Sequence, residues 1–263
     1  MRPLSAFAAS PPTAPVRGLL FDLDDTLLTH GQLTLEAYQA LWQLRASGFV
    51  LVAVTGRPSG WGEVLVRQWP IDAAVTENGA VHIVREGMGL AIRERCTADE
   101  RHSRRIRLAR IVARVADVVP EARLADDVAA RRSDVTWDIG ERVRMPTDRV
   151  DLIAHEILAA GGRTTRSSVH IHATFDEDDK ASGSARLLSR DFHIDAGAAL
   201  RTFAFVGDSG NDAACFAAFD LTFGVANVVA SVGRLSVPPR YVADSPMGKG
   251  FAEIARALVH TRA

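Results

Sequence analysis

Residues 16–26 read VRGLLFDLDDT, an apolar run that passes directly into acidic residues. The apolar part, residues 16–21, predicts a short β-strand that is buried on both faces, as in a parallel sheet. Asp22 and Asp24 follow at the point where this strand should end. Ligands of open parallel α/β sheets bind beyond the carboxyl ends of the strands. This stretch therefore predicts a parallel sheet with a functional site at its edge.

The sequence that follows repeats the pattern. Thr34 is suited to begin a helix, and residues 49–54 (FVLVAV) form a second apolar run that ends at Thr55. A strand, a helix and a strand in this order form a βαβ unit, which builds parallel sheets with right-handed crossovers. The pattern returns at residues 202–206 (TFAFV), which lead into Asp208. We therefore expect a doubly wound α/β core with a mostly parallel, Rossmann-like sheet.

The middle of the chain has a different pattern. Residues 101–119 carry apolar side chains at helical spacing, whereas residues 135–143 and 169–175 partly alternate between apolar and polar. Helices combined with alternating strands predict an α+β domain on an antiparallel sheet. The expected organisation is a discontinuous core of residues 16–81 and 176–263, an inserted α+β cap domain of residues 82–175, and a flexible N-terminal tail of residues 1–15.

The composition argues against several classes of partner. The chain has 263 residues and a formal net charge of −1, so no overall field draws it to nucleic acid or to an anionic membrane. No apolar run approaches the roughly 20 residues of a membrane-spanning helix, and residues 1–15 make a poor signal peptide. Cys96 and Cys215 have no metal-type spacing. The arginine-rich stretch of residues 101–114 is interpreted as a solvated helix face. We therefore expect a cytoplasmic protein with no nucleic-acid or membrane partner.

Acidic side chains should converge at the carboxyl edge of the sheet, where Asp22, Asp24 and Asp208 follow two of its strands. Two unit charges about 4 Å apart repel by roughly 4 kcal/mol at an effective dielectric constant of about 20. Such a cluster needs either a retained proton or a cation. Ligands that are all oxygen favour a hard cation, and Mg²⁺ suits a few carboxylates with open positions for water and phosphate. The sequence therefore predicts a Mg²⁺ site.

Donor groups for a phosphate lie in the same segments. The Thr55 hydroxyl and the backbone N–H groups that follow it at Gly56 can contact phosphate oxygens. Only two of the 31 basic residues are lysines, Lys180 and Lys249. A lysine in a chain that otherwise uses arginine indicates a need for a compact point charge. Lys180 is the preferred candidate for phosphate binding, and Lys249 is its rival.

Four segments, taken together, resemble the motifs of the haloacid dehalogenase-like (HAD) superfamily. DLDDT at residues 22–26 matches the first motif, DxDx[TV], and TGR at residues 55–57 resembles the second. Lys180 resembles the third, and GDSGND at residues 207–212 resembles the fourth. The insertion falls between the second and third motifs, and residues 77–80 read ENGA. Both features resemble subfamily IIB, which includes Cof-type and sucrose-phosphate phosphatase-like proteins.

The resemblance implies a role for each matching residue. Asp22 would be the nucleophile that takes the phosphoryl group, and Asp24 would be the general acid and base. Thr26 would fix the loop rather than react. The other implied roles are metal binding by Asp22, the backbone carbonyl of Asp24 and Asp208, support of that metal by Asn211 and Asp212, and phosphate binding by Thr55, Gly56 and Lys180.

These expectations favour a Mg²⁺-dependent phosphatase that hydrolyses a small phosphorylated metabolite through an aspartyl-phosphate. A sugar phosphate is the substrate that the family resemblance implies. One alternative is a phosphomutase of the phosphomannomutase-like type, and another is a non-enzymatic phospho-aspartate signalling or binding module. His170 and His172 alternate along one expected strand and are open to two interpretations, metal binding or a packed, hydrogen-bonded face of the cap.

Overall fold

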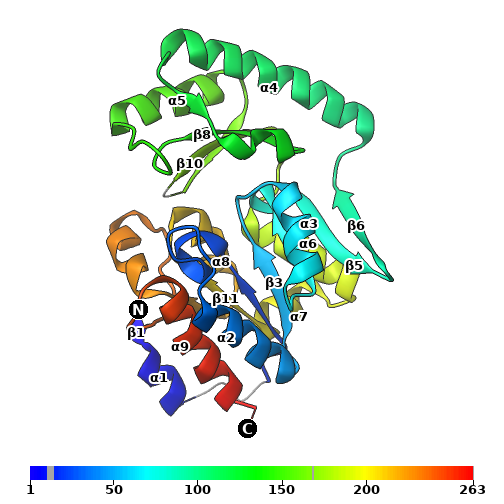
Figure 1. The fold of residues 1–263 in the computed structure, drawn as a ribbon, viewed down its shortest axis with the longest axis vertical. Helices are drawn as coiled ribbons and strands as arrows, with labels where there is room; N and C mark the ends of the chain where they lie inside the picture. Colours follow the sequence, from blue (N-terminus) through cyan, green and yellow to red (C-terminus); the bar gives the residue numbers. More distant parts are fainter. Residues whose placement is uncertain (11–14, 168, 263) are drawn as a thin grey trace.

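The structure is a computed structural model and describes residues 1–10, 15–167 and 169–262. A nine-stranded sheet lies in the lower domain of Figure 1, and all of its strands run in the same direction except β5, the eighth strand in the order below. The strands follow in the order β1 (Arg2–Pro3), β13 (Tyr241–Val242), β12 (Leu221–Gly224), β11 (Phe203–Gly207), β2 (Gly18–Phe21), β3 (Val50–Val54), β4 (Ala73–Thr76), β5 (Val81–Glu86) and β6 (Gly89–Glu94).

Helices cover both faces of this sheet, as expected for a doubly wound core. Within β2, Leu19 and Phe21 pack on one face while Leu20 packs on the other, so every position of the strand is buried. One face carries α1 (Leu4–Ala9), α2 (Leu35–Ala46), α3 (Ser59–Gln68) and α9 (Met247–His260). The opposite face carries α6 (Lys180–Phe192), α7 (Ala196–Thr202) and α8 (Ala213–Ala218).

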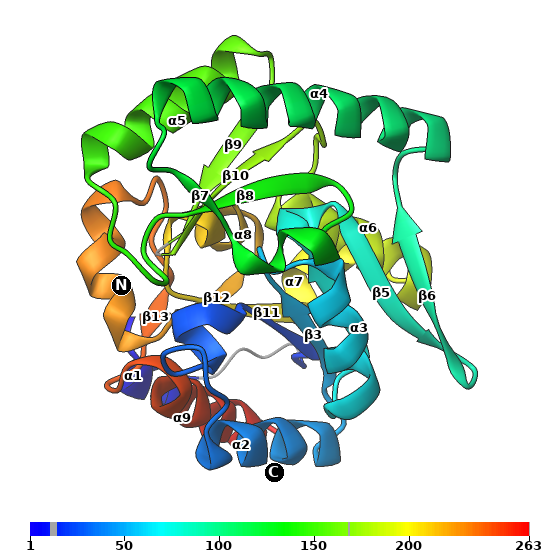
Figure 2. The same cartoon turned by 45° about the horizontal axis from the view of Figure 1, so that its top comes forward.

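A second domain, the cap, lies above the core and contains a four-stranded antiparallel sheet (Figure 2). Its strands follow in the order β7 (Arg123–Leu124), β8 (Asp134–Asp138), β10 (His170–Thr174) and β9 (Arg163–Arg166). The helices α4 (Ala98–Val118) and α5 (Thr147–Ala159) cover the outer face, where they pack against Trp137 and Ile171. Since side chains alternate along a strand, His170 and His172 occupy the inner face, which is turned toward the core.

Two expected boundaries are wrong. The cap does not start at residue 82, because β5 and β6 extend the core sheet as an antiparallel hairpin. The left-handed residues Asn78 and Gly79 turn the chain back along β4, so pairing to that strand continues. Residues 1–10 are not a flexible tail either. β1 pairs with β13, and Phe7 is fully buried against the rings of Phe223 and Tyr241. The remaining part of that expectation, at residues 11–14, lies outside the described residues.

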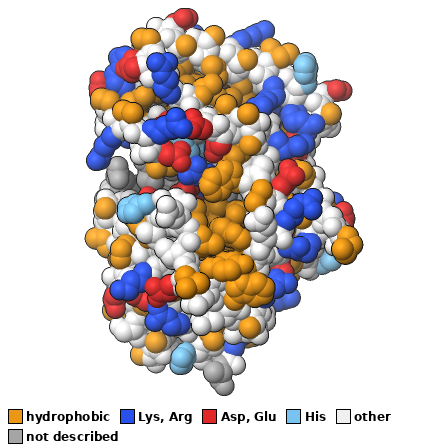
Figure 3. Space-filling model, in the orientation of Figure 1, with side chains coloured by type: hydrophobic (Ala, Val, Ile, Leu, Met, Phe, Trp, Pro, Cys, Tyr) orange, Lys and Arg blue, Asp and Glu red, His pale blue; other side chains and the backbone are white. Residues whose placement is uncertain are grey.

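The cap also contacts the core away from its two connecting segments. Figure 3 shows basic and acidic side chains close together on the part of the cap that faces the core. The Glu77 carboxylate of the core accepts hydrogen bonds from the backbone N–H of Arg132 at 2.9 Å and of Ser133 at 2.6 Å. It also accepts one from the Ser133 hydroxyl at 2.7 Å. These contacts fix the beginning of β8 against the core.

Among the described residues, no helix is both long enough and apolar enough to cross a membrane. Cys96 and Cys215 are both free thiols.

Candidate active site

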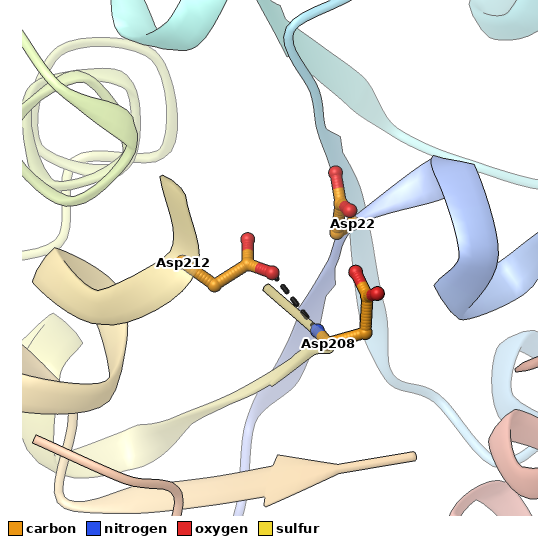
Figure 4. Close-up of side chains that lie close together, drawn as sticks. All are labelled: Asp22, Asp208 and Asp212. Atoms are coloured by element: carbon orange, nitrogen blue, oxygen red, sulfur yellow. Dashed lines mark hydrogen bonds between the residues drawn. The ribbon is translucent and has the colours of Figure 1, made fainter. Parts of the chain in front are cut away.

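Three buried aspartates meet at the carboxyl ends of β2 and β11 (Figure 4). Asp22 follows β2, whereas Asp208 and Asp212 follow β11, its neighbour in the sheet. Carboxylate oxygens of the three residues lie within 4.8 Å of one another. The backbone N–H of Asp22 donates a hydrogen bond to the carbonyl oxygen of Val206 at 2.9 Å, which fixes the end of β2 against β11. The expected convergence of Asp22 with Asp208 is therefore confirmed, whereas the third carboxylate of the cluster is that of Asp212 and not that of Asp24.

Lys180 joins two of these carboxylates. Its amino group lies 2.7 Å from Oδ1 of Asp22 and 2.7 Å from Oδ1 of Asp212. Lys180 is the first residue of α6 and is only 1% exposed. Lys249, the rival candidate, is exposed and lies on α9. Of the two lysines, it is therefore Lys180 that the structure places beside Asp22.

Asp208 and Asp212 are fixed by separate sets of donors. Thr26 donates to Oδ1 of Asp208 at 3.2 Å, and Asn227 donates to Oδ2 at 2.9 Å. The carboxylate of Asp212 accepts the backbone N–H groups of Asp208 at 2.9 Å and Ser209 at 3.1 Å. A Cβ atom at residue 207 would lie 2.4 Å from this carboxylate, so the close approach requires the glycine found there.

The cluster carries more negative charge than its single lysine balances. Burial raises the pKa of Asp22 to about 7, against the opposing effect of Lys180. Burial, together with the charges of Asp212 and Asp22, also raises the pKa of Asp208 well above its usual range. Burial alone would lower the pKa of Lys180, but Asp212 and Asp22 hold it above its ordinary value. The site therefore has the electrostatic character of a cation site.

Asp24 lies on the cap side of the cluster, and an arginine holds it. Arg57 donates to Asp24 Oδ2 through Nε at 2.9 Å and to Oδ1 through Nη2 at 2.9 Å. The same Nη2 donates to Glu141 of the cap at 2.9 Å, and Glu141 in turn lies 2.9 Å from Nε2 of His170. The Arg57 guanidinium also lies over the ring of Trp61, and its Cζ atom is 4.7 Å from the centre of that ring. A continuous chain of contacts thus runs from Asp24 across to the cap.

The other expected site residues lie close by. The fully buried Thr55 accepts the backbone N–H of Arg57 at 3.0 Å, which shapes the loop after β3. Gly56 and Asn211 line a small cavity together with Asp22 and Asp24. This cavity has a volume of about 10 Å³, which is about the room of one water molecule. A larger cleft of about 570 Å³ adjoins it, and Ser167 and Ser209 line both.

The cap supplies one wall of the small cavity through His170 and His172. Each is 2% exposed. Burial is the main cause that lowers the pKa of both imidazoles, so both are neutral near pH 7. Ser168, between Ser167 and the strand, lies outside the described residues. The two histidines belong to a hydrogen-bonded face of the cap, since their ring nitrogens contact Glu141, Asp134 and Thr136.

Sequence reasoning missed several residues of the site. Arg57 belongs to the segment TGR, from which no role for its side chain follows, although its position directly after Thr55 and Gly56 places it at the edge of the sheet. Asn227 donates to both Asp208 and the backbone carbonyl of Asp25, yet it lies in a short helix outside every motif. Glu141 comes from a loop of the cap, and its contact depends on how the two domains meet.

Comparisons with known proteins gave matches to one family and to several solved structures. Residues 19–93 match the family described as haloacid dehalogenase-like hydrolase. A search of curated proteins finds no significant match. Among solved structures, a Thermoplasma acidophilum protein superposes with a TM-score of 0.73 at 16% identity, covering 93% of this chain and 99% of that one.

Two further solved structures are of phosphatases that act on sugars. The sucrose-phosphatase of Synechocystis sp. PCC6803, solved with sucrose and phosphate, gives a TM-score of 0.63 at 17% identity and covers 93% of this chain and 98% of that one. A sugar phosphatase of HAD subclass IIB gives 0.64 at 16% identity, with the same coverage. At these identities the likeness establishes a shared fold. The chain is therefore similar to haloacid dehalogenase-like hydrolases over residues 19–93, and it shares the fold of the sugar phosphatase of HAD subclass IIB.

Proposed function

We propose that this protein is a Mg²⁺-dependent phosphatase that hydrolyses a small phosphate monoester, a sugar phosphate in particular, through a phosphorylated Asp22. The observation that carries the proposal is the position of Asp22. Its Oδ1 is held by Lys180, while the residue lines a cavity that it shares with Asp24. A nucleophile and a proton-transfer group on one cavity are the minimum that a two-step phosphoryl transfer requires.

The donor set fits a magnesium ion. The available donors are carboxylate oxygens, which suit a hard cation, and the three aspartates are buried with only one lysine among them. The raised pKa values of Asp22 and Asp208 indicate an excess of negative charge that a cation would relieve. Asp22, Asp208 and the backbone carbonyl of Asp24 would hold the ion, with Asp212 and Asn211 in support. The ion would neutralise charge on the phosphoryl group and orient it.

The chain's own groups account for both chemical steps. In the first step, a carboxylate oxygen of Asp22 bonds to phosphorus while the bond from phosphorus to the ester oxygen breaks. Asp24 gives its proton to that oxygen, and the alcohol leaves. In the second step, Asp24 takes a proton from water as the water oxygen bonds to phosphorus. The bond from phosphorus to Asp22 then breaks and releases inorganic phosphate, which restores both carboxyl groups.

Phosphate binding in this proposal falls to the loop after β3 and to Lys180. Thr55, the backbone of Gly56 and the Lys180 ammonium would contact the non-bridging oxygens and stabilise charge in the transition state. The cavity of about 10 Å³ is too small for a whole ester, but the adjoining cleft of about 570 Å³ has room for the leaving group. The names of the sucrose-phosphatase and the sugar phosphatase among the structural neighbours support a sugar phosphate.

The test is hydrolysis of p-nitrophenyl phosphate and of a panel of sugar phosphates, with Mg²⁺ or with EDTA, between pH 5 and 9. We expect release of phosphate only with metal. Asp22→Asn should lower kcat by about a thousandfold or more, since it removes the nucleophile. The exposed Asp220→Asn is the matched control and should leave kcat unchanged. Absence of metal-dependent hydrolysis contradicts the proposal. Conversion of a hexose 1-phosphate to another phosphorylated sugar, without free phosphate, would favour a phosphomutase instead.

A further inference from the structure

His172 is held by a buried series of hydrogen bonds that starts at Gly56, in the loop after β3. Arg131 donates through Nη1 to the carbonyl oxygen of Gly56 at 2.9 Å. The same nitrogen lies 3.1 Å from Oδ2 of Asp134, and this oxygen lies 2.8 Å from Nδ1 of His172. The side chains of Arg131, Asp134 and His172 are at most 2% exposed. The orientation of the His172 ring is therefore fixed relative to the loop after β3.

This series of hydrogen bonds also fixes which ring nitrogen carries the proton. Burial would raise the pKa of Asp134, but Arg131 and His172 lower it below its usual range, so Asp134 is an ionised acceptor. An ionised carboxylate can only accept, and therefore Nδ1 of His172 is the donor. Burial lowers the pKa of His172, which leaves the ring neutral. In a neutral ring with the proton on Nδ1, Nε2 has a bare lone pair and acts as an acceptor.

The ring faces the reacting end of the site. His172 lines the small cavity with Asp22, Asp24 and Gly56, and its Cε1 lies 3.2 Å from the position that a Cβ atom on Gly56 would take. Nε2 has no hydrogen-bond partner within the parts of the chain that the structure describes. A bare lone pair repels the oxygens of a phosphate and attracts a hydroxyl donor. His172 therefore does not belong with the phosphate-binding groups.

We propose that Nε2 of His172 accepts a hydrogen bond from a hydroxyl group on the leaving group, close to the ester oxygen, and thereby selects phosphorylated polyols. This inference rests on the proposed phosphatase function and specifies its substrate class. The hydroxyl must lie near the ester, because His172 shares its cavity with Asp22 and Asp24 and does not line the larger cleft. Asp134 and Arg131 act through His172 as positioning residues.

The test compares two esters that differ in one hydroxyl, glycerol 1-phosphate and propane-1,3-diol 1-phosphate, with p-nitrophenyl phosphate as a reference for hydrolysis. We expect the wild-type protein to prefer the glycerol ester by about tenfold or more in kcat/KM, as for one lost hydrogen bond at a buried acceptor. His172→Phe removes the acceptor while keeping a ring, and it should bring the ratio close to one. His155→Gln, on the exposed side of α5, is the control and should keep the wild-type ratio.

The outcomes separate the inference from the function beneath it. If p-nitrophenyl phosphate is not hydrolysed with Mg²⁺, both the proposed phosphatase function and the inference about His172 are wrong. If that ester is hydrolysed but the two propyl esters react equally, only the inference fails. A preference that survives in His172→Phe also overturns it.

A measurement on the wild-type protein guards against a variant that does not fold. Nitrogen NMR of protein labelled at histidine reports the tautomer of each ring directly. We expect a protonated Nδ1 and an unprotonated Nε2 for His172. A proton on Nε2 would overturn the inference whatever the kinetics.

Discussion

The amino group of Lys180 lies 2.7 Å from the carboxylate of Asp22, although 158 positions separate the two residues in the chain. The contact joins the start of α6 to the end of β2 and makes Lys180 the counter-charge for the nucleophile of the proposed reaction. Lys180 also contacts Asp212, so its removal would leave two buried carboxylates without their cation.

Lys180→Met should therefore reduce both stability and activity. Removing one partner of a buried ion pair leaves an uncompensated charge and costs about 3–5 kcal/mol of unfolding free energy. The exposed Lys249→Met is the matched control and should change the unfolding free energy by less than about 0.5 kcal/mol. Urea unfolding, followed by phosphatase assays on the folded fraction, measures both effects. Equal losses in the two variants would contradict the role given to Lys180.

Addition of Mg²⁺ should stabilise the protein. A ligand present at about 100 times its Kd adds about 2.7 kcal/mol to the unfolding free energy. Asp208→Asn removes a ligand and should abolish the increase in Tm. Because that change also removes one of the crowded charges, the variant should be at least as stable as wild type in EDTA. Thermal unfolding with and without Mg²⁺ tests this, and an undiminished increase in Asp208→Asn would refute the metal assignment.

Arg57→Lys should lower kcat by about tenfold. Lysine keeps the charge, but a single ammonium cannot bond both oxygens of Asp24 and also reach Glu141 as the guanidinium does. Asp24 would then lose its fixed orientation toward the leaving group. Steady-state kinetics with Arg67→Lys, an exposed arginine of α3, provide the comparison. A rise in KM with unchanged kcat would show that Arg57 acts on cap closure and not on Asp24.

Glu77→Gln should loosen the cap where β8 begins. Its carboxylate accepts hydrogen bonds from Ser59, Arg132 and Ser133, and an amide would turn an N–H group toward some of these donors. The expected cost is about 2 kcal/mol of unfolding free energy. Hydrogen exchange should speed up in residues 126–134. Glu63→Gln on α3 is the control, and unchanged exchange in Glu77→Gln would show that other contacts hold the cap.

His82 should make stability depend on pH in the acidic range. Burial, with Arg186 and Arg190, lowers its pKa from 6.5 to about 2 in the folded protein. Between these values only the unfolded chain binds the proton, so this contribution to stability is present above pH 6.5 and is lost as pH falls. His82→Phe has no imidazole at this position and should lack this pH dependence. As the pH falls from 6.5 to 5, the unfolding free energy of the variant relative to wild type should rise by about 2 kcal/mol. Urea unfolding at several pH values measures this, and a constant difference would contradict it.

The convergence of the site was predictable because it depends on strand ends. Asp22, Asp208 and Lys180 each sit at the end of a strand or the start of a helix, and parallel strands bring such positions to one edge. The start of α2 was predictable for the same reason, and the Thr34 side chain accepts a hydrogen bond from the backbone N–H of Ala37 at 3.3 Å. Features of this kind are encoded within a few neighbouring residues.

What escaped prediction depends on long-range pairing. Residues 81–86 begin apolar and end charged, which gives no sign that they extend the core sheet rather than begin the cap. Asn227 reaches Asp208 only because a helix without a recognisable motif lies beside β12. β1 and β13 pair over two residues each, which is too short a stretch to produce a periodic pattern in the sequence. Its neighbours are rich in Pro, Ala and Ser, which suggested a tail.

The pairing of β1 with β13 has a practical consequence for anyone who expresses this protein. A shortened version that starts at residue 15 would leave β13 as an open edge and would uncover Phe223 and Tyr241, whose rings pack against Phe7. Open edges beside aromatic surface promote self-association. A protein trimmed at its amino terminus is therefore expected to aggregate, and a loss of activity in it would not test the catalytic residues.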